Sequence, residues 1–206
     1  MIQVKICGIT NEDDALEAVA HGANAIGFVF AKKSPRCVSV EGAARVRRSL
    51  PVFTKVVGVF VEHTPEEILD VANTVRLDVL QLHGNYGPGE CRFLAQYHPV
   101  IKVFHLQDDR LPKIGDYPAD AFLVDSRVEG ALGGTGVVCN WDLAHKLARR
   151  VPLILAGGLT PENVREGIAR VRPMAIDVCS GVEAYPGKKD HGKLRELLQK
   201  VRSWYD

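Results

Sequence analysis

The chain has 206 residues, 46% of them hydrophobic, and its 26 Lys and Arg against 25 Asp and Glu give a formal net charge of +1. This near balance argues against a nucleic-acid partner, because binding to phosphates requires a basic excess. The longest apolar run, residues 25–31, is far shorter than the roughly 20 residues of a membrane span. The N-terminal residues lack the basic region and apolar core of an export signal. We therefore expect a globular protein that binds neither nucleic acid nor membranes.

Five cysteines are spread along the chain as single residues, without a CxxC pair or an HExxH motif. Zinc sites need clustered ligands, so a structural metal is not expected, and scattered thiols are typical of a reducing cytoplasm. Most of them are interpreted as small buried hydrophobic side chains. The cysteines are Cys7, Cys37, Cys91, Cys139 and Cys179.

Short apolar runs alternate with helix-like segments along the whole chain. Each run is rich in Val, Ile and Phe and ends near Gly, His, Ser or Asp, which is typical of buried parallel strands. The predicted strands are residues 2–7, 25–30, 55–61, 79–82, 100–104, 121–124, 153–156 and 175–178.

Helices are predicted between these strands from their start signals. Asn11 is expected to cap a helix that runs through residue 21. Thr64 is followed by proline and two glutamates, which gives a capping hydroxyl, proline at the first helical position and an acidic first turn. Thr160 repeats this signal before residues 163–170. The remaining helices are expected at residues 40–50, 90–97, 141–149 and 191–205.

The connection after the fifth strand is the weakest unit. Residues 105–120 contain Pro112, Gly115 and Pro118, so a helix there is expected to be short or absent. Eight strand–helix units of about 26 residues each predict a compact, single-domain (β/α)₈ TIM barrel over residues 1–206. An open, doubly wound sheet is the alternative, because local patterns do not show whether a sheet closes.

The reactive groups of such barrels lie where the strands end, on the loops that follow. Alternation along the first strand turns Lys5 and Cys7 toward the barrel interior, with Cys7 at the last strand position. A nearby ammonium favours the thiolate, so Cys7 is interpreted as a reactive thiol. Asp125 ends the sixth strand, where it either caps the next loop or gives the site a second titratable group. Such a pair suits proton removal at one atom and proton donation at another.

Glycines follow the last two strands. Gly157 and Gly158 come after the seventh strand, and Ser180 and Gly181 come after the eighth. Barrels often bind phosphate on this pair of loops, where backbone N–H groups can approach an anion, although tight turns also need glycine. The sequence therefore predicts a phosphate site there.

Further positions are candidate ligand contacts. Gly134 and Thr135 belong to a glycine cluster after the sixth strand, which is predicted to form a ligand loop without the GxGxxG spacing of a dinucleotide site. Arg36 is either a clamp for a substrate carboxylate or a solvated loop arginine. Gln81 and His83 share the inward face of the fourth strand as polar core groups, with His83 close enough to the mouth to contact a ligand.

Short motifs along the chain resemble those of one enzyme family. The motifs are KICGIT at residues 5–10, GFVF at 27–30, SPR at 34–36, QLHG at 81–84, VDS at 124–126, GGTG at 133–136, LAGGLTPENV at 155–164, SGVE at 180–183 and GKKD at 187–190. In this order they resemble the phosphoribosylanthranilate isomerases, and the resemblance spans essentially the whole chain.

The resemblance implies a (β/α)₈ barrel of tryptophan biosynthesis. Its reaction is the Amadori rearrangement of N-(5-phosphoribosyl)anthranilate to 1-(2-carboxyphenylamino)-1-deoxyribulose 5-phosphate, without metal or organic cofactor. The resemblance implies Cys7 as general base, Asp125 as general acid and Arg36 as the contact of the anthranilate carboxylate. The implied phosphate-binding residues are Gly157, Gly158, Ser180 and Gly181.

Two alternatives stay open. The related isomerase of histidine biosynthesis performs the same rearrangement on a different amine, but that family has Asp where this chain has Cys7. A catalytically silent phospholigand-binding barrel needs the glycine loops but neither Cys7 nor Asp125.

The expected partner is a small phosphorylated substrate, the expected location is the cytoplasm, and a monomer is favoured over an oligomer. Family members commonly have Ser where this chain has Cys179.

Overall fold

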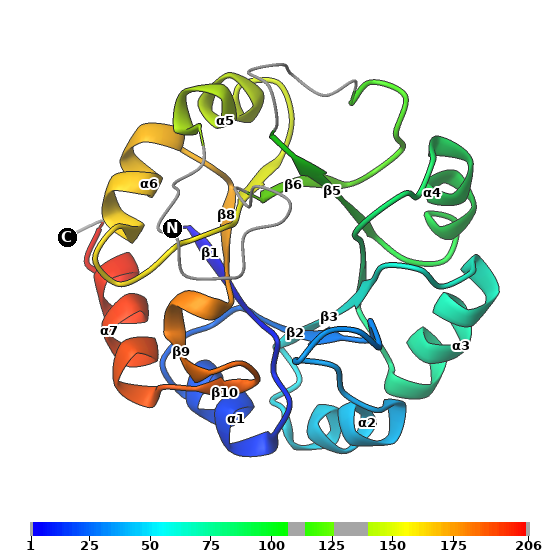
Figure 1. Ribbon diagram of the computed structural model, residues 1–206, viewed down its shortest axis with the longest axis horizontal. Coiled ribbons are helices and arrows are strands. Elements are labelled where there is room, and N and C mark those ends of the chain that lie inside the picture. Colours follow the sequence, from blue (N-terminus) through cyan, green and yellow to red (C-terminus); the bar gives the residue numbers. More distant parts are fainter. Residues whose placement is uncertain (1, 107–113, 126–139, 205–206) are drawn as a thin grey trace.

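Eight parallel strands form a closed barrel in the computed structural model, which describes residues 2–106, 114–125 and 140–204. The first strand is hydrogen-bonded to the second on one side and to the eighth on the other, so the ring closes and the open-sheet alternative is wrong. Figure 1 shows this ring inside a layer of helices. The barrel strands are β1 (Gln3–Cys7), β2 (Ala25–Val29), β3 (Lys55–Phe60), β4 (Val79–Leu82), β5 (Val100–His105), β6 (Ala121–Asp125), β7 (Leu153–Leu155) and β8 (Ala175–Val178).

Seven α-helices cover the outside of the barrel within the described residues. The described part of the connection between β5 and β6, which leaves out residues 107–113, contains no helix, in agreement with the weak pattern of that unit. Within the same described ranges, no helix is long and apolar enough to cross a membrane. The helices are α1 (Glu12–Ala20), α2 (Val40–Ser49), α3 (Pro65–Val75), α4 (Pro88–Leu94), α5 (Trp141–Ala148), α6 (Val164–Val171) and α7 (His191–Arg202).

The two similar helix-start signals have different outcomes. At α3, the Thr64 backbone N–H donates to Glu67 and the Glu67 backbone N–H donates to the Thr64 hydroxyl, which completes a capping box. At α6, the Thr160 backbone N–H donates to Asn163 Oδ1 at 2.8 Å. That contact closes a turn before the helix, so α6 begins only after Asn163.

Side-chain alternation along the strands separates two cores. The larger core lies between strands and helices and includes Val4 and Ile6, whereas a smaller cluster that includes Val57, Leu123 and Ile154 fills the barrel. This alternation confirms the prediction that the odd-numbered residues of β1 face inward.

A repeated polar contact ties pairs of neighbouring strands together at the amino end of the barrel. The Val4 backbone N–H donates to Asn24 Oδ1 at 2.8 Å, and the Asn24 N–H donates back to the Val4 carbonyl at 2.8 Å. Asp78 makes the same reciprocal pair with Val56, and Asp120 makes it with Val100. Polar groups with a structural role therefore occupy the amino end of the barrel, opposite the carboxyl ends of the strands.

A small hairpin after β8 was not predicted. A 3-10 turn (Ser180–Val182) leads into β9 (Glu183–Tyr185), which pairs with β10 (Lys188–Lys189). The fully buried carboxylate of Asp14 in α1 fastens this hairpin, because it accepts from Lys188 Nζ at 2.6 Å and from the Lys189 backbone N–H at 2.8 Å. This contact links α1 to the loop that follows β8.

Replacing Asp14 by Asn is expected to cost about 2 kcal/mol of stability at pH 7, since a charged hydrogen-bond acceptor is lost. Burial alone would raise the pKa of Asp14, but hydrogen bonds from Lys188 and Lys189 hold it below its ordinary value. A carboxyl group with a lowered pKa stabilises the folded state at pH values above its pKa in the unfolded chain, which is about 4. This stabilisation is lost as the pH falls below that value and through the lower pKa of the folded state. Urea unfolding measures the difference in the free energy of unfolding between the Asp14→Asn variant and the unchanged chain. This difference should therefore be smaller at pH 3.5 than at pH 7.

The neighbouring Asp13→Asn variant is the control, because Asp13 is exposed on the same helix turn. An Asp14→Asn penalty of equal size at both pH values would contradict the electrostatic account.

Candidate active site

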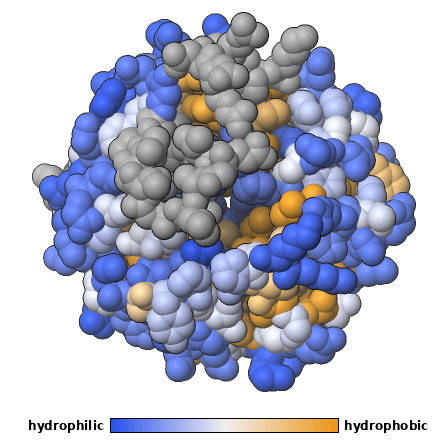
Figure 2. Space-filling view, in the orientation of Figure 1, coloured by the Kyte–Doolittle hydropathy of each residue, from blue (hydrophilic) through white to orange (hydrophobic). Residues whose placement is uncertain are grey.

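A cavity of about 210 Å³ lies at the carboxyl ends of the strands. The molecule is hollowed near the middle of the ring, with hydrophobic residues beside the hollow (Figure 2). Gly134 and Thr135, predicted to contact a ligand, lie outside the described residues. The other predicted site residues all line this one cavity: Cys7, Arg36, His83, Asp125, Gly157, Gly158, Ser180 and Gly181.

Cys7 ends β1 and is buried beside Lys5. A Cβ atom built on the adjacent Gly27 would lie 2.9 Å from Cys7 Sγ and 3.0 Å from Lys5 Nζ, so the thiol and the ammonium meet over this glycine. Lys5 Nζ also donates to both oxygens of Asp177 at 2.9 Å. The base of the cavity therefore holds a thiol, an ammonium and a carboxylate.

The surroundings of Cys7 favour its thiolate. A hydrogen bond from Cys179 and the charge of Lys5 hold the pKa of Cys7 well below its ordinary value, against the opposing effect of burial. The same hydrogen bond, together with burial, raises the pKa of the Cys179 thiol. Lys5 therefore favours the Cys7 thiolate, and Cys179 is a neighbour of Cys7 that the sequence interpretation did not include.

Asp125 ends β6 and lines the same cavity as Cys7. Its register partner on β5 is His105, whose ring lies 5.1 Å from the ring of His83. Burial and the neighbouring His105 lower the pKa of His83, so this imidazole is neutral near pH 7. A carboxyl group and a neutral imidazole therefore share one wall of the cavity.

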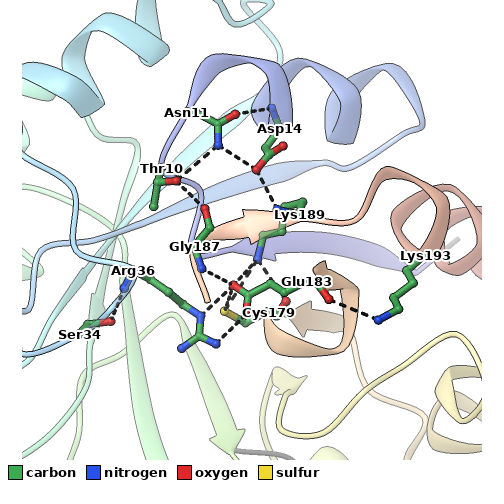
Figure 3. Close-up of polar contacts among 10 residues, drawn as sticks. All are labelled: Thr10, Asn11, Asp14, Ser34, Arg36, Cys179, Glu183, Gly187, Lys189 and Lys193. Atoms are coloured by element: carbon green, nitrogen blue, oxygen red, sulfur yellow. Dashed lines mark hydrogen bonds and ion pairs between the residues drawn. The ribbon is translucent and has the colours of Figure 1, made fainter. Parts of the chain in front are cut away.

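Arg36 lies at the mouth with its fork bound to a residue of the hairpin. Its Nε and Nη2 donate to the two carboxylate oxygens of Glu183 at 2.8 and 2.6 Å, and Lys189 Nζ donates to the same carboxylate at 3.2 Å. Figure 3 shows Glu183 between these two cations. Arg36, interpreted from the sequence as either a clamp for a substrate carboxylate or a solvated loop arginine, thus has a buried partner, which uses two of its five N–H donors.

Glycine is required by the backbone on both predicted phosphate loops. Gly157 and Gly158 have φ values of 80° and 64°, in the left-handed region that side chains disfavour. A Cβ atom at Gly181 would collide with the carbonyl group of Leu159, which belongs to the loop after β7. The loops after β7 and β8 are therefore in direct backbone contact.

The Gly181→Ala variant is expected to lose about 2–3 kcal/mol of stability, because the added methyl group forces this backbone contact apart. Urea unfolding measures the loss. Gly89→Ala is the matched control, since a Cβ atom at that helical glycine meets nothing within 4 Å. Equal stability of the Gly181→Ala variant and the unchanged chain would refute the tight packing of the two loops.

Gln81 was interpreted as a satisfied core group, and the structure differs from that interpretation. Its side chain is buried and lines the cavity, and within the described ranges its Oε1 has no hydrogen-bond partner. A buried oxygen without a donor costs about 1–3 kcal/mol, so it suits a ligand hydroxyl group. No sequence signal separates this glutamine from a satisfied one.

No group of three or more His, Cys, Asp and Glu side chains is placed to hold a metal ion within the part of the chain that the structure describes. The cavity instead offers a thiol, a carboxyl group, an arginine and glycine-rich loops. Together with the closed ring of parallel strands, these groups define a (β/α)₈-barrel enzyme with its site at the carboxyl ends of the strands.

Comparison with known proteins narrows this class to one family. The family model for N-(5'phosphoribosyl)anthranilate (PRA) isomerase matches residues 4–200. The chain therefore belongs to the phosphoribosylanthranilate isomerase family and is an isomerase.

Relatives and solved structures agree over nearly the full length. The N-(5'-phosphoribosyl)anthranilate isomerase of Geobacter sulfurreducens is 47% identical over 205 residues, which cover 99% of this chain and 100% of the relative. The crystal structure of the Thermotoga maritima enzyme has a TM-score of 0.90 at 44% identity, covering 98% of this chain and 100% of that one. A second isomerase structure, in complex with reduced 1-(o-carboxyphenylamino)-1-deoxyribulose 5-phosphate, has a TM-score of 0.86 at 42% identity, with 98% and 100% coverage.

Proposed function

We propose that this chain catalyses the Amadori rearrangement of N-(5-phosphoribosyl)anthranilate in tryptophan biosynthesis. The observation that carries the proposal is one cavity lined by a thiol from β1 and a carboxyl group from β6, with glycine loops beside them. The relative that binds a reduced product analogue supports the same substrate class for this chain.

Asp125 is proposed as the general acid. Opening of the aminosugar ring requires a proton on the ring oxygen and leaves an iminium ion, so this carboxyl group must enter the reaction protonated. Cys7 is proposed as the general base that then removes the proton from C2, a carbon made acidic by the adjacent iminium. The resulting enolamine tautomerises to the ketone. Positioned groups of this kind each contribute about 10²–10⁴-fold to the rate.

The two anionic ends of the substrate match the two ends of the cavity. Backbone N–H groups of the loops after β7 and β8 are proposed to hold the phosphate, through Gly157, Gly158, Ser180 and Gly181. The N–H donors of Arg36 that are not hydrogen-bonded to Glu183 are proposed to bind the anthranilate carboxylate.

The sugar chain is proposed to lie between these ends. Gln81 would accept a hydrogen bond from a sugar hydroxyl, since its buried Oε1 is unpartnered within the described ranges. His83 would contact the substrate as a neutral imidazole. Gly134 and Thr135 of the loop after β6 are proposed as further contacts. Holding both ends of the substrate orients C2 between base and acid.

A coupled assay of the purified chain with freshly formed phosphoribosylanthranilate tests this proposal. The disappearance of the substrate is followed by its fluorescence. We expect turnover with this substrate and much weaker turnover with the phosphoribosyl aminosugar of histidine biosynthesis. Preference for the second substrate would favour the histidine-pathway alternative, and binding of both without turnover would favour a silent phospholigand barrel.

A cytoplasmic location and a monomeric state stay predictions. One solved structure of the Thermotoga maritima isomerase is described as monomers generated from a dimeric enzyme. Light scattering of the purified chain measures its oligomeric state directly.

A further inference from the structure

Lys5 and Asp177 form a buried ion pair in the floor of the cavity, and the proposed acid–base roles do not use it. Both side chains are less than a tenth exposed, and Lys5 Nζ lies 2.9 Å from each carboxylate oxygen. They come from register partners on β1 and β8, the two strands that close the ring. Asp177 also lines the cavity itself.

This ion pair abuts the proposed base. The space over Gly27 is bounded by Cys7 Sγ and by Lys5 Cε and Nζ, each 2.9–3.0 Å from the position of an added Cβ atom. One ammonium therefore faces two acids, the Cys7 thiol on one side and the Asp177 carboxyl group on the other. Burial, opposed by Lys5 and reinforced by the Cys7 thiolate, raises the pKa of Asp177 to about 7.

A buried ammonium without a counterion is strongly destabilising. If Cys7 were the only anion beside Lys5, each protonation of Cys7 during turnover would leave Lys5 unpaired. Asp177 removes this difficulty, because its bidentate contact keeps Lys5 paired whichever protonation state Cys7 adopts. A thiolate that shares its cation with a second anion is also the stronger base.

We propose that Lys5 and Asp177 are positioning residues for the base: Lys5 stabilises the Cys7 thiolate, and Asp177 holds Lys5 in place and keeps Cys7 basic enough to remove a carbon-bound proton. This inference rests on the proposed function of Cys7. It makes Cys7, Lys5 and Asp177 one unit, with a basic sulfur, a cation and an orienting carboxylate.

Other groups also face Cys7, and they define the background against which this unit is tested. Cys179 donates a hydrogen bond to it, and Lys189 and Arg36 contribute positive charge from the hairpin and from the loop after β2. His83 and Asp125 face it across the cavity, and Glu183 contacts Cys179 and both cations. None of these groups is changed in the test below.

The test measures the rate at which iodoacetamide alkylates Cys7 in the full chain between pH 4 and pH 10, with the modified Cys7 peptide quantified by mass spectrometry. Alkylation follows the thiolate fraction and needs no substrate. The variants are Lys5→Gln, Asp177→Asn and the double variant, which removes both buried charges and so leaves neither unpaired. Asp78→Asn, at the opposite end of the barrel, is the control for loss of a structural carboxylate.

We expect the two single variants to shift the alkylation midpoint in opposite directions. Lys5→Gln should raise it by about one pH unit or more, because a cation beside the thiol is lost. Asp177→Asn should lower it, because the competing anion is lost, and should lower kcat more than it changes KM. The double variant loses both opposing charges, so its midpoint should lie between those of the two single variants, and Asp78→Asn should leave the midpoint unchanged.

Midpoints that move in the same direction in both single variants, or that stay unchanged in both, would overturn the proposal. A merely structural ion pair would give one of those two results. Absence of turnover by the unchanged chain would instead contradict the proposed function, and the alkylation profile would still decide whether Lys5 and Asp177 control the thiol.

Discussion

Replacing Cys7 by Ala should lower kcat for phosphoribosylanthranilate by about 10²–10⁴-fold while KM changes little. The methyl group leaves the cavity walls in place but offers no base for the C2 proton. The thiolate is the group that its surroundings prepare for this step, since Cys179 and Lys5 both lower the pKa of Cys7. Initial rates from the fluorescence assay give kcat and KM for the variant.

Cys37→Ser is the matched control, because Cys37 is an exposed thiol outside the cavity and its replacement should leave the rate unchanged. Steady-state rates of Cys7→Ala that equal those of the unchanged chain would remove Cys7 as the base.

Replacing Asp125 by Asn should lower kcat by a similar factor of about 10²–10⁴. The amide has nearly the size of the carboxyl group but cannot deliver a proton to the ring oxygen, so ring opening should become the slow step. Binding of a reduced product analogue should persist, because the proposed phosphate and carboxylate contacts are unchanged. Titration calorimetry measures that binding, and the fluorescence assay measures the rate.

Asp120→Asn makes the same chemical change at the other end of the same strand. Asp120 accepts from the Val100 backbone N–H at 2.8 Å, far from the cavity, so its replacement should lower stability without lowering kcat. Turnover by Asp125→Asn within tenfold of the unchanged chain would show that another group supplies the proton.

Local sequence patterns predicted most of the fold. The strands lie within one residue of their predicted bounds, because each apolar run ends at a polar or glycine residue. Closure of the ring was not decidable in this way, since it depends on pairing of β1 with β8 across almost the whole chain. The β9–β10 hairpin was missed because strands of two or three residues have no readable periodicity.

In the candidate site, too, local patterns predicted some residues and missed those that only the closed ring brings together. Cys7 and Asp125 could be selected because strand ends converge at one mouth of a barrel. Lys5 and Arg36 were selected as well, but their ion-pair partners could not be, since Lys5 and Asp177 are 172 positions apart, and Arg36 and Glu183 are 147 positions apart. Buried ion pairs at such separations follow from the closed ring and leave no local signal.

A crystal structure of this chain with the reduced product analogue tests the central claim most directly. The account predicts the phosphate on the backbone N–H groups of the loops after β7 and β8, the benzoate carboxylate at Arg36, and C2 about 3–4 Å from Cys7 Sγ on the side opposite Asp125. An analogue bound with its phosphate elsewhere, or with its sugar chain out of reach of both Cys7 and Asp125, would contradict it.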